Sequence, residues 1–257
     1  LSRAAAADLP VQSFLRVDIN VSDGLSRVAK ELRATLALVG WERAPTVSSR
    51  LFGSGVKQLL ETCPSRLMFC RLVKPMNTAS RLLVLFGPLA ENRPDIAPLV
   101  RDAKRLARQI GAQMRVHLAA RASESFRRLL ASELPECPMA IRESAGLSEA
   151  GRNLAADIRE GDVVLFASER RADARWAPTL DRISAMIVQT HPEVNVLIAY
   201  PPPPGFREVG PLDEAVPVGP TCFRAVPATF APEEGLSGEL AAFTMAAFPG
   251  DAPQREL

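Results

Sequence analysis

The sequence repeats its own pattern. Residues 16–75 and residues 143–202 are not identical, but each contains a strand, an amphipathic helix, an apolar run, a polar loop, a second helical stretch and a final apolar strand. The apolar run at 36–39 corresponds to the run at 163–166. Strands that alternate with helices of this length predict βαβ units and a parallel sheet. We therefore expect an α/β fold of tandem doubly wound parallel sheets.

The two copies differ in completeness. Residues 76–142 supply elements that the first copy lacks, with strands expected at 81–86 and 115–119 and helices at 96–110 and 125–134. We predict that 1–75 is the carboxyl-terminal half of a first domain, 76–204 a complete second domain and 205–257 a Pro- and Gly-rich tail. The first unit is interpreted as incomplete at its amino end, in a fragment of a longer protein. The alternative is a natural start at 1–16, with the half-unit completing its sheet on another chain.

The tail after 204 follows a run of four prolines, which favours an extended chain and the end of the domain. We expect most of it to be poorly ordered. A weakly amphipathic island at 236–248 could instead dock on the parent domain, on a partner or on a membrane surface.

Composition limits the partners. Apolar residues make up 47% of the chain and aromatic residues only 5%, so the core is expected to be aliphatic. Thirty-one basic and 29 acidic residues leave a net charge of +2, which does not indicate nucleic acid as a partner. The basic residues of helix 96–110 are expected on a solvated face: Arg101, Lys104, Arg105 and Arg108. No apolar run approaches the roughly 18 residues of a membrane span, so this piece is expected to be soluble.

Catalytic and metal-binding patterns are missing from the sequence. The two histidines, His117 and His191, are far apart and form no constellation. The motifs of serine hydrolases, zinc proteases, P-loop NTPases and Rossmann dehydrogenases do not occur. Four cysteines without a CxxC pair indicate a reducing compartment, and Cys63 and Cys70 are expected to pack as ordinary core residues. We expect no enzymatic activity and no metal site.

One glycine pattern does indicate chemistry. After the apolar run at 36–39 comes Gly40, and further on Gly53, Ser54 and Gly55 lead into a helix expected to begin near Val56. Glycines let a backbone approach a phosphate, and a helix amino end offers free N–H groups. In a parallel sheet such a loop lies at the carboxyl edge, where ligands bind.

This spacing resembles the universal stress protein family, whose nucleotide-binding members carry Gly-x2-Gly-x9-Gly-(Ser/Thr) after their fourth strand. Gly40, Gly53 and Ser54 match, whereas Arg43 replaces the second glycine. The resemblance implies an adenine nucleotide or a cyclic dinucleotide held by Gly40, Arg43, Gly53, Ser54 and Gly55. The family's first-strand contacts have no counterpart here. The loop at 168–176 has no glycine, so the second unit is expected to be structural or dimer-forming.

Longer stretches are similar to the cytosolic tail of bacterial monovalent cation/proton antiporters, which carries two universal-stress-like domains in tandem. The residues that carry this resemblance are 37–41 (ALVGW), 50–60 (RLFGSGVKQLL) and 70–78 (CRLVKPMNT). It implies a homodimeric regulatory domain on the cytoplasmic side of the inner membrane, joined to a Na+ or K+ transport domain of the same polypeptide. The alternatives are a soluble nucleotide-binding stress protein without a membrane part and an inert dimerisation scaffold.

Overall fold

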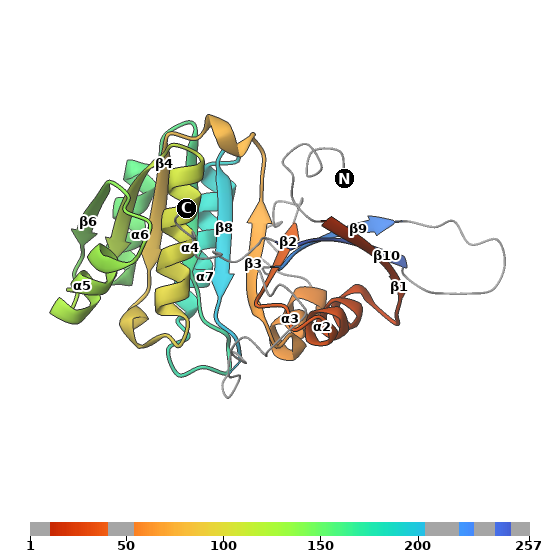
Figure 1. Ribbon diagram of the computed structural model, residues 1–257. Helices are drawn as coiled ribbons and strands as arrows, with labels where there is room; N and C mark the ends of the chain where they lie inside the picture. Colours follow the sequence, from red (N-terminus) through yellow and green to blue (C-terminus); the bar gives the residue numbers. More distant parts are fainter. Residues whose placement is uncertain (1–10, 41–53, 204–220, 229–239, 248–257) are drawn as a thin grey trace, which may run out of the picture. The chain divides into compact units, whose positions relative to one another are not determined.

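The structure is a computed structural model that describes residues 11–40, 54–203, 221–228 and 240–247 (Figure 1). The chain divides into two compact units. The first comprises residues 1–40, 53–68 and 202–257, and the second comprises residues 41–52 and 69–201. The domain boundaries expected at 75 and 204 remain predictions.

The first unit contains helices and an antiparallel sheet. Its elements are β1 (Val11–Val17), α2 (Val21–Glu31), β2 (Leu36–Gly40), α3 (Ser54–Thr62), β9 (Thr221–Ala228) and β10 (Leu240–Ala247). Strand β10 pairs antiparallel with both β1 and β9, so the order of this sheet is β1-β10-β9. Strands β9 and β10 fall in the segment expected to be a tail. The sequence did not predict them.

The second unit is a parallel α/β layer. Its elements are β4 (Arg81–Phe86), α4 (Ile96–Gln109), β5 (Gln113–Leu118), α5 (Glu124–Ser132), β6 (Met139–Glu143), α6 (Leu147–Asp157), β7 (Asp162–Ala167), α7 (Pro178–Thr190) and β8 (Asn195–Tyr200), with short 3-10 helices η1 (Met76–Thr78) and η2 (Ala90–Asn92). Neighbouring strands pair in parallel in the order β8-β7-β4-β5-β6. Strand β3 (Arg66–Arg71) spans the boundary between the two units. The expected α/β fold with a mostly parallel sheet is confirmed.

Helices cover both faces of the second unit's sheet. The chain leaves β4 toward β5 and β6, then crosses back to β7 and β8. Because such crossovers are right-handed, α4 and α5 lie on one face and α6 and α7 on the other (Figure 1). Phe86 of β4 packs edge to face on Phe126 of α5, with ring centroids 5.6 Å apart. All residues of β7 and β8 are buried, as expected for central strands with continuous apolar runs.

The basic face of α4 differs from the prediction at one position. Lys104 is buried rather than solvated. Its Nζ donates to the carbonyl oxygens of Ala131 at 3.3 Å and Glu133 at 2.6 Å, at the end of α5. Carbonyls at a helix end have no partner within the helix, so this lysine satisfies them. Arg108 on the same helix is exposed, as expected.

The two copies of the repeat share an order of elements but not a topology. The segments β1-α2-β2-α3-β3 and β6-α6-β7-α7-β8 have the same sequence of strands and helices, and α2 and α6 are each 11 residues long. However, β6 pairs in parallel with β5, whereas β1 pairs antiparallel with β10. The tandem arrangement and the incomplete first unit therefore stay predictions. Within the described ranges, no helix combines the length and apolar character needed to span a bilayer.

Candidate functional site

The topology of the second unit defines one place where a ligand would be expected. Strand β4 connects onward to β5 on one side, while its other neighbour, β7, belongs to the returning half of the unit. In open parallel sheets, ligands bind beyond the carboxyl ends of the strands at such a switch point. The segments that follow β4 and β7 at this edge contain η2 and the loop 168–176. They are the natural place to look for a site.

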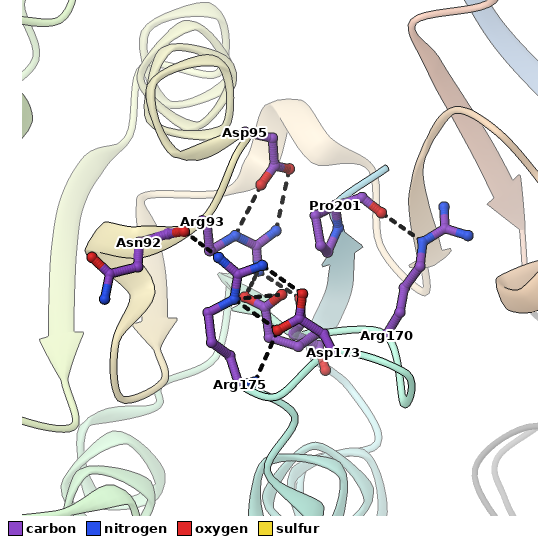
Figure 2. Close-up of polar contacts among 9 residues, drawn as sticks. Asn92, Arg93, Asp95, Arg170, Asp173, Arg175 and Pro201 are labelled. Carbon is purple, nitrogen blue, oxygen red and sulfur yellow. Dashed lines mark hydrogen bonds and ion pairs between the residues drawn. The ribbon is translucent and has the colours of Figure 1, made fainter. Parts of the chain in front are cut away.

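The side chain of Arg93 fills this place (Figure 2). It follows η2, and none of it is exposed to solvent. Its guanidinium makes a two-pronged contact with Asp95, at 3.0 and 3.2 Å. Through Nη1 it also donates to the carbonyl oxygen of Ser168 at 2.5 Å and to Oε1 of Glu169 at 3.0 Å. One arginine therefore ties the segment after β4 to the segment after β7.

A second arginine, Arg175, lies next to Arg93 and Glu169 (Figure 2). Arg175 makes a fork-like contact with Asp173, with distances of 2.8 and 2.5 Å, and its Nη1 donates to the carbonyl oxygen of Asn92 in η2. Its Nε lies 3.9 Å from Oε2 of Glu169 (Figure 2). Planar guanidinium groups suit such bidentate contacts with carboxylates. We call Arg93, Asp95, Glu169, Asp173 and Arg175 the switch-point network.

The end of β8 is attached to the same loop. Arg170 is buried, and its Nε donates to the carbonyl oxygen of Pro201 at 2.6 Å, directly after β8 (Figure 2). The carboxyl ends of β4, β7 and β8 are thus connected by arginine side chains. This loop is held by charged contacts rather than by glycine turns.

Burial and neighbouring charges shift the pKa of Glu169 in opposite directions. Burial raises the pKa of Glu169, although Arg93 and Arg175 oppose the shift. At the outer layer, the hydrogen bond from Arg175 lowers the pKa of Asp173, and the same bond raises the pKa of Arg175. An isolated buried charge would be unstable, so these groups depend on each other. Arg93 and its carboxylate partners therefore occupy the switch point with their charges paired, and we call this arrangement a plug.

Only part of the predicted glycine site lies in the described residues. Gly40 ends β2 and is exposed, and a Cβ there would meet no atom within 4 Å. Gly55 lies in the first turn of α3, where its carbonyl oxygen accepts a hydrogen bond from Ser22 Oγ at 2.6 Å. Ser54 begins α3. Arg43 and Gly53 lie outside the described residues, so the expected nucleotide site remains a prediction.

The packing of α2 against α3 positions the amino end of α3. Gln58 of α3 donates to Asp23 Oδ1 at 2.8 Å, and the hydroxyls of Ser26 and Thr62 are 2.7 Å apart. Asp23 also belongs to the cap of α2, because its N–H donates to Asn20 Oδ1. These polar contacts fix the start of α3 beside α2, at the point where the predicted loop ends.

His117, the fifth residue of β5, is buried beside a cluster of charged side chains. Its Nε2 lies 3.3 Å from Asp157 Oδ2, yet neither ring nitrogen has a hydrogen-bond partner among the described residues. Arg115 donates to both oxygens of Asp157 at 2.6 and 2.7 Å. Arg81 contacts Asp157 and Asp162 in the same cluster. The sequence did not indicate that His117 has Asp157 as a charged neighbour. Both side chains are buried, so we do not assign them to a ligand site.

The sequence did not predict the switch-point network. Its one available signal was the composition of the loop 168–176, which has five charged residues where the first copy has glycines. Arg93 and Asp95 gave no signal, because they lie in an irregular segment far from that loop in the sequence. No group of three side chains suited to a metal ion occurs in the described part of the chain.

Comparisons with known proteins give a likeness among solved structures. No family model matches the chain, and the curated proteins contain no match either. Among solved structures, the chain is similar to a universal stress protein from Archaeoglobus fulgidus DSM 4304, with 13% sequence identity and a TM-score of 0.48. The likeness covers 71% of this chain and 66% of that one, so the matched region spans just under two thirds of the neighbour's length.

Proposed function

We propose that this chain is a non-catalytic regulatory module on the cytoplasmic side of a membrane monovalent cation/proton antiporter. The resemblance of residues 37–41, 50–60 and 70–78 to antiporter tails motivates the proposal. The observation that carries it is the plug formed by Arg93 at the switch point. A unit whose ligand position is filled by its own side chain is suited to a structural or signal-transmitting role.

In this proposal the two units have different roles. The glycine loop from Gly40 to Gly55 binds an adenine nucleotide or a cyclic dinucleotide in the first unit. The second unit provides the rigid parallel sheet and a homodimer contact. A ligand can bias the attached transporter only if it binds more tightly to one arrangement of the module than to the other. The expected coupling is therefore a change in ion exchange on addition of the nucleotide.

The test is deletion of residues 1–257 from the full-length parent protein. Everted vesicles with the intact and truncated proteins would be assayed for Na+- and K+-driven proton exchange, with and without ATP, AMP and a cyclic dinucleotide. We expect exchange to persist in the truncated protein and its response to nucleotide to disappear. Identical exchange in both proteins under every condition would refute a regulatory role.

The glycine loop also favours a second candidate, a soluble nucleotide-binding stress protein with no membrane part. Fractionation of the native protein separates the two, because an antiporter tail is recovered with the membrane and a free stress protein with the cytosol. Calorimetry with the same nucleotides then tests binding. Gly53→Val should abolish any binding by blocking the approach of the backbone to phosphate. The inert scaffold is the outcome if neither binding nor coupling is found.

A further inference from the structure

A shallow groove lies between α6 and α7, on the opposite face of the sheet from α4 and α5. Its base is formed by Gly151 and Ile183, which are buried, and its rim includes the exposed Met186 and the arginines Arg152 and Arg182. We call it the α6–α7 groove. Neither the proposed nucleotide loop nor the switch-point network uses any of these residues.

Close packing of the two helices gives the groove a fixed base. A Cβ at Gly151 would lie 2.6 Å from Ile183 Cδ1, so only glycine permits this approach of α7 to α6. The volume of the groove is about 240 Å³. This is below the roughly 300–1,000 Å³ of sites that enclose a drug-sized molecule. The groove suits a single apolar side chain of a partner rather than a nucleotide.

The rim of the groove carries two exposed arginines. Among the described residues, neither Arg152 nor Arg182 has a hydrogen bond or an ion pair. The carboxylates nearest in sequence form their hydrogen bonds elsewhere: Glu149 accepts from the N–H of Ala145 at 2.8 Å and Asp181 accepts from the indole of Trp176 at 3.3 Å. Two free guanidinium groups beside an apolar base call for an anionic occupant with an apolar side chain.

The charge also selects between partners. A second copy of the chain placed on the groove by a two-fold axis would bring arginine against arginine, which is repulsive. A lipid bilayer offers a negative surface, but a flat surface does not enter a groove. We propose that the α6–α7 groove binds an acidic peptide segment of a partner protein, in which one large apolar side chain is flanked by carboxylates. This proposal does not depend on the antiporter assignment.

The test uses the full chain and fluorescence anisotropy of a labelled hexapeptide with two central leucines flanked by pairs of glutamates. The wild-type protein should bind it, and Arg152→Gln with Arg182→Gln should weaken binding about tenfold, as expected for the loss of two exposed ion pairs. Met186→Glu should also abolish binding, because it places a carboxylate at the rim. The control pair is Arg108→Gln with Arg121→Gln, which removes two exposed arginines elsewhere and should leave binding unchanged.

Matched probes decide between occupants. A peptide with glutamines in place of the glutamates should bind poorly, and binding of the acidic peptide should weaken with added salt. Absence of binding to the wild type, or equal binding by the Arg152/Arg182 double variant, would overturn the proposal. Groove-dependent binding to vesicles of anionic phospholipid, with none to the peptide, would also overturn it and assign the groove to a membrane surface. Deletion results on ion exchange bear on the regulatory role and not on this groove.

Discussion

Arg93 and Glu169 form an ion pair of 3.0 Å in which 0% and 8% of the two side chains are exposed, although 76 positions separate them in the sequence. Arg93 also neutralises Asp95, so its removal leaves Asp95 without this counter-charge and Glu169 with only the more distant Arg175, 3.9 Å away. Arg93→Met should therefore lower the free energy of unfolding by about 3–5 kcal/mol. Glu169→Gln keeps an acceptor for Arg93 and should cost below about 2 kcal/mol.

The measurement is urea unfolding followed by the fluorescence of Trp176, in a Trp41→Phe background that leaves one tryptophan, in the second unit. Arg121→Met, at an exposed arginine, serves as the control and should change stability by less than about 0.5 kcal/mol. An Arg93→Met protein as stable as this control would show that the plug contributes nothing to the fold.

His117 predicts a dependence of stability on pH. Burial lowers its pKa below 6.5; Asp157 opposes the shift, while Arg142 and Arg115 add to it. The unfolded chain thus binds a proton more readily than the folded one between that lowered pKa and 6.5, so stability falls as pH drops through this window. His117→Gln should lose less stability between pH 7.5 and 5.5 than the wild type does.

Urea unfolding at the two pH values gives the comparison. His191→Gln, at the end of α7, provides a matched control because it removes a histidine outside the buried cluster, and it should follow the wild type. If His117→Gln loses as much stability on acidification as the wild type, the buried histidine is not the source of the pH dependence.

Glu169 affects the pH dependence of stability in the opposite direction to His117. Burial raises its pKa, so its contribution to stability falls as pH rises above 4.5.

The hydrogen bonds of Lys104 to backbone carbonyls should contribute to the free energy of unfolding. Lys104→Met keeps the length of the side chain but leaves the carbonyls of Ala131 and Glu133 without their donor. We expect a loss of about 1.5–3 kcal/mol, the range for hydrogen bonds to a charged group. Arg108→Met on the same helix should be nearly neutral. Equal stability of the two variants in urea would contradict the capping role.

Gly151 predicts a steric coupling between α6 and α7. Alanine favours a helix over glycine, but the new methyl group would overlap Ile183, so Gly151→Ala should destabilise the chain by about 1–3 kcal/mol. Ile183→Val removes the Cδ1 atom that comes closest. The double variant should therefore be more stable than the sum of the single effects predicts, as measured by a double-mutant cycle. Strict additivity would rule out the contact.

The sequence predicted the central elements well, and physical reasons explain where it did not. Strands expected at 81–86 and 195–200 have these bounds in the structure, because continuous apolar runs between turn residues leave little choice. Strands β9 and β10 were missed. Strand β10 pairs not only with its neighbour β9 but also with β1, more than 200 positions away, and no local pattern encodes that second pairing. Long-range pairing is the part of a fold that periodicity cannot indicate.

The residues of the candidate sites also fall into those that a local sequence pattern can indicate and those that only strand pairing brings together. Gly40 and Gly55 were selected from their spacing, because a glycine loop before a helix is a local signal, and their binding role stays a prediction. Arg93 could not be selected in this way, since its partners Ser168 and Glu169 come to it only through the parallel pairing of β4 with β7. Lys104 was misplaced for a related reason: helical periodicity put it with the polar face, and the end of α5 that buries it lies on another element.

The burial of the switch-point network has a consequence for behaviour in salt. Mobile ions screen charges at a surface within about 10 Å at 0.1 M, whereas pairs without solvent contact are screened far less. Exposed pairs such as Lys57 with Glu61 should weaken as the salt concentration rises, while Arg93 should hold its carboxylates. The loop after β7 should therefore keep its place over a wide range of salt concentration.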